Sequence, residues 1–248
     1  LNKDQRLFGR TTITRRNSVN SIALFPGDAP AQGFQDKSYQ WVVGHSWNIT
    51  STLFNQATVG VSNQIFAFPP TASPAFPNSF TFGGGITSPY PSQSFQDRDV
   101  FTPTIRDDVT WVKGSHTFQF GAQIKPIRQK STLINDFNFV SLGLGGLTTA
   151  LNTSLRPANI LNSATARGNW DSAFPFLLGR IASLSTNYNY NTQGVAQVPG
   201  TGKKRNFHYN EYEFYATDNW RIRNDLTLNL GVRYYLYPAP FEANGLQA

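Results

Sequence analysis

The chain has 248 residues and a formal net charge of +7, but only 14% of its side chains are charged, against roughly 25% in ordinary soluble domains. No stretch approaches the roughly 20 consecutive apolar residues of a membrane helix, so any membrane-spanning segment would have to be a strand. The lack of cysteine excludes disulfides and thiolate metal sites. Since the chain also begins without methionine or a signal segment, we expect residue 1 not to be the native N-terminus.

The positive charges are scattered along the chain, and the only run is Lys203-Lys204-Arg205. A basic patch is one signature of nucleic-acid binding. A solvated loop or a contact with anionic lipid explains a single short run better. We therefore expect no nucleic-acid partner.

Seven segments alternate between apolar and polar residues over a length that suffices for a tilted membrane-spanning strand. They lie near residues 5–16, 37–48, 53–66, 99–112, 116–129, 207–221 and 225–237. The sequence thus predicts an all-β chain of about seven strands.

The alternation also predicts which side chains share a face, and it is clearest in the fifth and seventh segments. We expect an apolar set to face outward to lipid: Phe118, Phe120, Ala122, Leu228, Leu230 and Val232. We expect a polar set to face inward to a lumen: Gln119, Gln123, Asn229 and Arg233. A soluble sandwich would show the same alternation, so periodicity alone does not separate lipid from core.

Three tryptophans, Trp47, Trp111 and Trp220, each precede a short polar turn and an alternating run that ends in glycine. Residues 2–9 look like the second half of a fourth such unit. A repeated strand, turn and strand indicates an array of hairpins, and an amphipathic indole ring suits a membrane interface. We expect the three tryptophans to lie in one interfacial layer at one end of the sheet.

The connections between the segments differ in length at the two ends. The turns that follow the tryptophans are a few residues long, whereas the opposite connections run over about 17–36, 67–98 and 130–206. Short periplasmic turns and long extracellular loops are typical of bacterial outer-membrane barrels. We therefore predict an antiparallel up-and-down transmembrane β-barrel segment with long extracellular loops.

The second long connection is rich in proline and contains Gly83-Gly84-Gly85, which argues against a regular central strand over 67–93. The three glycines are not a phosphate-binding loop, because no Lys-Ser/Thr pair or helix follows them.

The third connection, 130–206, is long enough to hold structure of its own. We expect a short helix over Trp170–Arg180, capped by Asp171 or Ser172 and stopped at Gly179. The run Ile181–Tyr190 is expected to form an extra hairpin arm outside the membrane. So long a loop is most often functional.

The titratable residues suggest no metal or catalytic site. His45, His116 and His208 are dispersed, while Glu211 and Glu213 share one strand face and His208 lies on the other. The two carboxylates could contact a metal or a substrate. We favour a lumen wall in which they pair with Arg221, with Arg233 or with neighbours on missing strands.

Asp107-Asp108 is the only adjacent acidic pair that invites comparison with acid and base catalysis. Neighbouring residues of a strand point to opposite faces, so the two carboxylates cannot act on one bond. The aromatic residues Tyr188, Tyr190 and Phe207 could stack on sugars or peptides, or simply pack a loop. We expect no catalytic residue, no cofactor and no bound metal, hence no enzyme, and the ligand-binding residues stay unknown.

Residues 213–235, Glu-Phe-Tyr-Ala-Thr-Asp-Asn-Trp-Arg-Ile-Arg-Asn-Asp-Leu-Thr-Leu-Asn-Leu-Gly-Val-Arg-Tyr-Tyr, closely resemble the barrel of TonB-dependent receptors, especially the Oar-like group. Residues 108–121 are similar to an earlier hairpin of that barrel, and residues 173–179 to a loop segment. The resemblance implies a barrel of about 22 strands around an N-terminal plug. It also implies energised import driven by the TonB complex.

No plug and no TonB box are recognisable, and seven strands cannot close such a barrel. We therefore expect residues 1–248 to be a partial barrel in the bacterial outer membrane, with 130–206 as its long extracellular loop region. The sheet should have two open edges, at strands 5–16 and 225–237.

The leading hypothesis is a receptor that binds lipid, the TonB complex through its plug, and an extracellular siderophore, carbohydrate or peptide. A structural or adhesive surface protein without transport is the alternative. A soluble β-sandwich enzyme or carbohydrate binder is the third.

Overall fold

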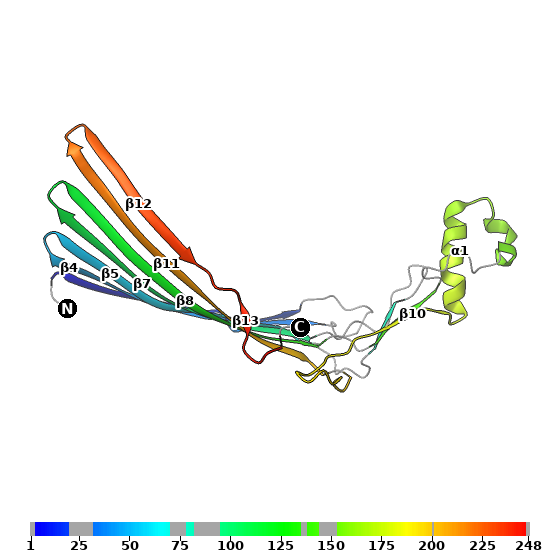
Figure 1. The fold of residues 1–248 in the computed structure, drawn as a ribbon. Coiled ribbons are helices and arrows are strands. Elements are labelled where there is room, and N and C mark those ends of the chain that lie inside the picture. The colour runs from blue at the N-terminus through cyan, green and yellow to red at the C-terminus, as the bar shows by residue number, and fades with distance from the viewer. Residues whose placement is uncertain are drawn as a thin grey trace.

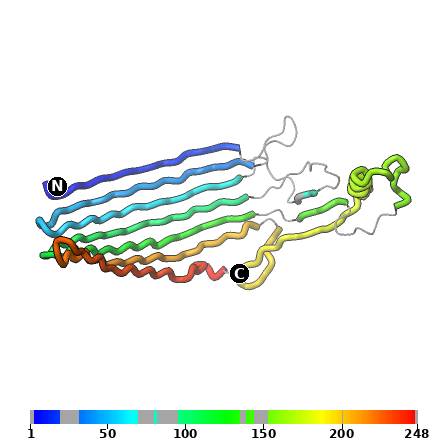
Figure 2. The backbone as a smooth tube through the Cα atoms, turned by 90° about the horizontal axis from the view of Figure 1, so that it is seen from above, coloured from blue at the N-terminus to red at the C-terminus, as the bar shows by residue number. Residues whose placement is uncertain are grey.

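The computed structural model describes residues 3–19, 32–69, 78–81, 95–134, 138–143, 153–199 and 201–246. Its main feature is an antiparallel sheet whose long strands follow one another in chain order (Figures 1 and 2). The strands are β1 (Gln5–Ile13), β4 (Tyr39–Thr50), β5 (Leu53–Phe68), β7 (Phe95–Lys113), β8 (His116–Ile134), β11 (Lys203–Arg223) and β12 (Leu226–Leu236). The expected seven strands and their up-and-down order are confirmed.

The expected strand ends are less accurate, chiefly at the long connections. β7 begins at Phe95 rather than near 99, β8 continues to Ile134, and β11 begins at Lys203. The third connection therefore spans 135–202 rather than 130–206. The first strand, in contrast, stops at Ile13, and a separate short strand, β2 (Arg16–Val19), follows.

Two further short strands complete this sheet where the long connections begin. β3 (Gly33–Asp36) pairs with β2 and with the end of β5. β13 (Phe241–Glu242) pairs with β11 beyond the last β11–β12 pair, so that β12 and β13 follow the same side of β11.

The sheet is open. Within the described residues, β1 pairs only with β4 and β12 only with β11, so each leaves one side without a neighbour. The two expected edges are confirmed. Strand edges in lipid need partners for their backbone groups, because no water is present to satisfy them.

Register decides which side chains share a face, because residues opposite each other on neighbouring strands point to the same side. Following the pairs across the sheet puts Trp47, Trp111 and Trp220 on one face, called here the tryptophan face. All three lie beside the turns at 51–52, 114–115 and 224–225, at the hairpin end of the sheet (Figure 1). The predicted position of the tryptophans is confirmed, and the other end is called the loop end.

The third connection carries a small structured arm beyond the main sheet (Figure 1). A three-stranded sheet places β9 (Asn138–Leu142) between β6 (Asn78–Thr81) and β10 (Ile181–Thr186). β10 pairs antiparallel with β9, so residues 181–190 do not form the expected self-contained hairpin. Within the second connection, β6 is a short edge strand, and Gly83-Gly84-Gly85 lies outside the described residues.

The arm ends in helices: η1 (Thr153–Leu155), η2 (Ala158–Ile160) and α1 (Ala164–Leu177). Among the described residues, no helix is both long and apolar enough to cross a membrane.

Helix α1 begins earlier than the sequence suggested. Ser163 is its N-cap and accepts a hydrogen bond from the Ala166 backbone N–H at 3.2 Å, whereas Asp171 and Ser172 lie inside the helix. The expected cap was therefore wrong. Gly179, with φ of +69°, ends the helix as expected, because glycine adopts the left-handed conformation without a Cβ clash.

Candidate functional site

The tryptophan face is apolar in the hairpin half of the sheet. Its register pairs bring together side chains from all seven strands: Leu7, Trp41, Val43, Val59, Val61, Ile105, Val109, Phe118, Phe120, Phe214, Leu228, Leu230 and Val232. Many of these are exposed, including Val232 at 68% and Ile105 at 52%. This surface is called the apolar belt.

The belt includes a few polar side chains, and two pairs of them are in contact. Asp107 accepts a hydrogen bond from the Asn55 amide at 2.6 Å. At the hairpin end, Asp218 lies 2.7 Å from Nδ1 of His116, whose ring stacks between Phe118 and Trp220.

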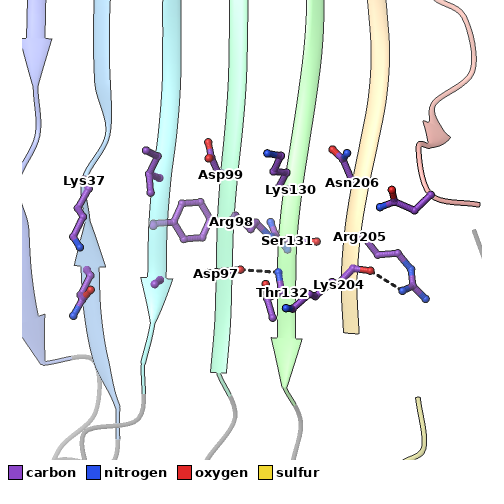
Figure 3. A pocket seen from close by; sticks show the side chains of 15 residues that line it. Lys37, Asp97, Arg98, Asp99, Lys130, Ser131, Thr132, Lys204, Arg205 and Asn206 are labelled. Atoms are coloured by element: carbon purple, nitrogen blue, oxygen red, sulfur yellow. Dashed lines mark hydrogen bonds between the residues drawn. The ribbon is translucent and has the colours of Figure 1, made fainter. Parts of the chain in front are cut away.

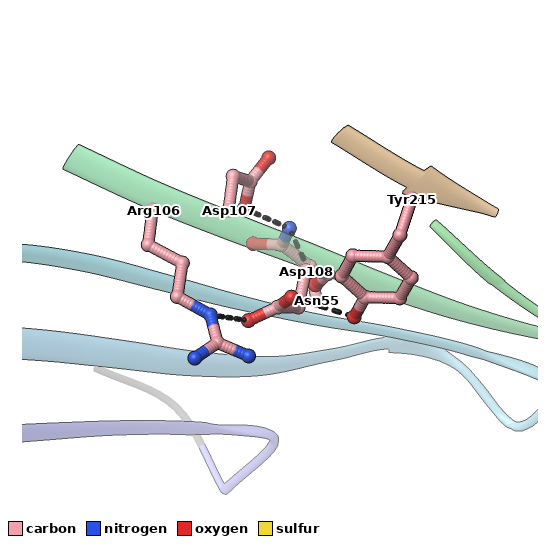
Figure 4. Close-up of polar contacts among 5 residues, drawn as sticks. All are labelled: Asn55, Arg106, Asp107, Asp108 and Tyr215. Atoms are coloured by element: carbon pink, nitrogen blue, oxygen red, sulfur yellow. Dashed lines mark hydrogen bonds and ion pairs between the residues drawn. The ribbon is translucent and has the colours of Figure 1, made fainter. Parts of the chain in front are cut away.

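The opposite face of the same half is polar, and a chain of side-chain contacts across it is called here the polar wall (Figure 4). Arg106 Nε lies 2.6 Å from one Asp108 oxygen, and the Tyr215 hydroxyl donates to the other at 2.7 Å. The Arg233 guanidinium lies over the Tyr215 ring, 5.2 Å from its centroid. The wall thus crosses from β7 over β8 to β11 and β12.

A glycine makes this arrangement possible. A Cβ on Gly121 would lie 2.1 Å from the Tyr215 ring and 2.5 Å from an Asp108 oxygen. The absence of a side chain lets the tyrosine lie flat over the backbone of β8 and reach the carboxylate on β7. Figure 4 also shows Asp107 and Asp108 pointing to opposite faces, as expected.

The two glutamates lie on the polar wall, as the hypothesis required, and His208 lies on the other face. Glu211 pairs with Lys125 at 3.2 Å, and Glu213 accepts a hydrogen bond from the Tyr237 hydroxyl at 3.3 Å. Neither Arg221 nor Arg233 forms an ion pair with them among the described residues. Each glutamate therefore has a polar partner on this face, but the partner is Lys125 or Tyr237 rather than Arg221 or Arg233.

Toward the loop end the two faces exchange polarity. On β8 the tryptophan face changes from Ile124 and Pro126 to Arg128 and Lys130, while the opposite face gains Ile127, which is only 7% exposed. Aromatic and aliphatic side chains join Ile127 on that face: Phe66, Val100, Phe207 and Tyr209. The change occurs where the β7–β8 ladder is interrupted over 102–104.

Above this change, the tryptophan face is hollowed into a cavity of about 560 Å³ (Figure 3). A second hollow, of about 330 Å³, adjoins it and shares Asp99, Lys130 and Asn206. Together they are called the loop-end pocket. The side chains that the tryptophan face contributes to it include Lys37, Asn63, Asp97, Phe101, Arg128, Lys204 and His208.

The C-terminal segment borders the loop-end pocket. Glu242, 4% exposed, accepts hydrogen bonds from the backbone N–H groups of Asn206, Asn244 and Leu246. Burial alone would raise the pKa of this carboxyl, but the three donors outweigh it and hold the pKa below its ordinary value. The charged carboxylate thereby fixes residues 242–246 against β11.

Comparison with known proteins shows which class of sheet this is. A family model described as an outer membrane beta barrel domain matches residues 1–248. The chain belongs to this outer-membrane β-barrel family. Neither the curated proteins nor the solved structures contain a match.

In an outer-membrane barrel the apolar belt faces lipid, and the polar wall faces the lumen. The seven strands are therefore an antiparallel up-and-down segment of a barrel in the bacterial outer membrane, with the long loops outside the cell. At the tilt of about 40° that is usual in such barrels, the stretch of β7 from Trp111 to Phe101 would rise roughly 25 Å along the membrane normal, which is the height of their lipid-facing band. Tyr39, Phe101 and Tyr212 lie toward its upper border, opposite the tryptophan layer.

The other candidates from the sequence are separated in the structure. The three histidines lie on the tryptophan face but apart, and the described residues hold no group of three or more side chains placed to bind a metal. Phe207 lies within β11 rather than in a loop, whereas Tyr190 forms a bridge with Ala196 in the arm. Sequence reasoning missed the loop-end pocket, because its residues come from five strands and only their register brings them together.

Proposed function

We propose that this outer-membrane barrel is the wall of a TonB-dependent, Oar-like receptor that takes up a ligand through its lumen. The observation that carries the proposal is the polar wall, a row of charged and aromatic groups on the inward face from Arg106 through Tyr215 to Arg233. The resemblance of residues 213–235 and 108–121 to such receptors supports it further.

The contacts of the polar wall suit transient binding. Arg106 and Asp108 hold each other and Tyr215 in fixed positions. Arg233 forms no ion pair with a carboxylate among the described residues, so its guanidinium is available to a passing carboxylate, phosphate or sugar hydroxyl. Several weak contacts of this kind would guide a siderophore, a carbohydrate or a peptide without trapping it.

Energised release would then come from a plug remodelled by the TonB complex. Capture would fall to the extracellular loops, including the arm that carries α1. The adhesive alternative uses the same loops but requires no polar lumen, so the two functions differ in whether ligand crosses the membrane.

Uptake by cells that carry the complete gene tests the proposal. Labelled siderophores, oligosaccharides and oligopeptides are offered with and without a protonophore, to wild type, to Arg233→Gln and to the matched control Arg223→Gln beside the turn at the hairpin end. We expect one class to accumulate only in energised cells, and Arg233→Gln to lower its uptake about tenfold through the loss of a charge-assisted contact.

The control variant should take up the ligand as wild type does. Assembly of each variant in the outer membrane is checked in parallel. If no class accumulates above a strain that lacks the gene while the protein is assembled, the uptake proposal is wrong. Loss of surface attachment in that strain would then favour the adhesive alternative.

A further inference from the structure

The loop-end pocket lies on the lipid-facing side of the barrel, directly above the apolar belt. Phe101 borders the belt below and the pocket above, and Arg128 is two residues beyond Pro126 on the same face. At this height the outward face meets the headgroups of the outer leaflet rather than acyl chains. An occupant of the pocket can therefore extend into the membrane.

The pocket contains three oxygen atoms that lack a hydrogen-bond donor among the described residues: Oδ1 of Asn63, Oδ1 of Asp99 and Oδ1 of Asn206. Asn63 is only 5% exposed, and its amide nitrogen donates to the Tyr39 hydroxyl at 3.3 Å, which fixes the direction of its oxygen. Buried acceptors without donors are costly. Their presence together indicates a ligand that brings donors such as hydroxyl groups.

The same pocket contains cations without anionic partners. Arg128 and Lys130 are neighbours on the outward face of β8, and Lys204 extends the group onto β11. Among the described residues, no carboxylate forms an ion pair with any of the three, although Asp99 lies opposite Lys130 in the register. Figure 3 shows the side chains of Asp99, Lys130 and Asn206 in a row across three strands. Such cations are the usual partners of phosphate groups.

We propose that the loop-end pocket binds the phosphorylated sugar headgroup of an outer-leaflet glycolipid. Arg128 and Lys130 contact a phosphate, while the oxygens of Asn63, Asp99 and Asn206 accept hydrogen bonds from sugar hydroxyls. The acyl chains pass over Phe101 and lie along the apolar belt. This role does not depend on transport through the lumen.

Native mass spectrometry of the detergent-purified protein tests the proposal. The probes are a glucosamine disaccharide glycolipid with two phosphates, the same glycolipid without phosphates, phosphatidylglycerol, and water-soluble glucosamine 1-phosphate. We expect the phosphorylated glycolipid to bind at least about tenfold more tightly than each other probe, because only it offers phosphate, hydroxyls and acyl chains together.

The double variant Arg128→Gln/Lys130→Gln should lose about tenfold in affinity for the phosphorylated glycolipid, and the charge-preserving Arg128→Lys/Lys130→Arg should keep most of it. Lys203→Gln is the matched control, because Lys203 precedes Lys204 on β11 but its side chain is on the other face and does not line the pocket. Folding is checked by heat-dependent gel mobility. If the double variant does not fold, Lys204→Gln replaces it and should weaken binding in the same direction.

Four results would overturn the proposal. Unchanged binding by the folded double variant, or an equal loss in Lys203→Gln, would show that the pocket is not the site. Equal binding of the dephosphorylated glycolipid would show that the phosphate does not contribute to binding. Equal binding of glucosamine 1-phosphate would make a soluble sugar phosphate, rather than a lipid, the ligand.

Discussion

The hairpin half and the loop half of the same strands have opposite polarity. In the hairpin half, the tryptophan face is apolar and the other face carries Arg106, Asp108 and Arg233. In the loop half, the tryptophan face carries Arg128 and Lys130, and the other face contains Ile127, which is only 7% exposed. The strands continue across the boundary, so the membrane border is set by side chains and not by strand ends.

The two halves of the sheet are adapted to different surroundings. In lipid, apolar side chains are favourable on the outward face, whereas in the water outside the membrane polar side chains are favourable outward and apolar side chains inward. Pro103 and Pro126 lie at the transition, where they interrupt the β7–β8 ladder because neither has a backbone N–H. The following substitutions test each half, from the largest expected effect to the smallest.

Val232→Arg should impair assembly most. Val232 lies in the apolar belt opposite Ala216 and is 68% exposed, so an arginine there would enter lipid at a cost of about 2–4 kcal/mol. It is a sharper test than Leu230, which lies opposite Asp218, since that carboxylate could partner an arginine. Refolding into bilayers, followed by gel mobility, measures the fraction assembled.

Asn229→Arg, on the lumen face of the same strand, is the control and should assemble almost as well as wild type. Equal assembly of the two variants would contradict the assignment of the apolar belt to lipid.

In the loop half, polar substitutions should be most damaging on the face opposite the tryptophan face. Ile127→Asn should destabilise this half by about 2–3 kcal/mol, because it buries an amide in an apolar setting. Ile65→Asn, the same substitution on the tryptophan face above the belt, should have little effect. Protease sensitivity of the extracellular half measures both, and a larger effect at Ile65 would refute the exchange of polarity.

Gly60→Ala tests whether the close approach of the β4 backbone to Gly60 on the lumen face requires glycine. An added Cβ would lie 2.8 Å from the Trp41 backbone oxygen, which cannot move aside as a side chain can, so we expect a loss of about 1–3 kcal/mol. At Gly9, on the tryptophan face, the nearest atom would be 3.9 Å away. Gly9→Ala should therefore be neutral in a urea titration of the refolded protein, and equal losses would show that backbone spacing is not the cause.

The smallest effect concerns the arm. Hydrogen bonds from Arg156, one of them 2.8 Å long, hold the pKa of Asp171 below its ordinary value. A lowered folded-state pKa means that this contact is fully stabilising above the ordinary carboxyl range and is lost as pH falls through the lowered pKa. The fluorescence of Trp170, which stacks on Phe174, should change over that acid range in wild type and not in Asp171→Asn. The same acid change in both proteins would exclude the ion pair as its cause.

The sequence was sufficient for the parts of the fold that depend on local pattern. Alternation located seven strands, and the position of Trp47, Trp111 and Trp220 before short turns predicted the hairpin end. Strand ends such as Lys203 and Ile134 were missed, because the alternation changes phase where the faces exchange polarity. A strand assigned by the alternation of one apolar face therefore ends at this boundary, although the real strand continues.

The candidate sites could not be predicted, because they depend on the register between neighbouring strands, which the sequence of one strand does not determine. The contact of Tyr215 with Asp108 joins residues 107 positions apart. It becomes possible only because Gly121 lies between them. Likewise, the start of α1 was misplaced because Gly168 and Asn169 have low helix propensity, and the tertiary contact between Arg156 and Asp171 offsets it.

Accessibility of single cysteines along β8 tests the central claim most directly, and the natural chain has no cysteine to interfere. Spin labels at each position from 118 to 132 are exposed to oxygen, which concentrates in lipid, and to a water-soluble nickel complex. We predict oxygen maxima at 118, 120, 122 and 124, then a change beyond Pro126, where labels at 128 and 130 become accessible to nickel and the label at 127 is protected from both reagents. Uninterrupted lipid accessibility of the even positions up to 132, or lipid accessibility of the odd positions, would contradict the account.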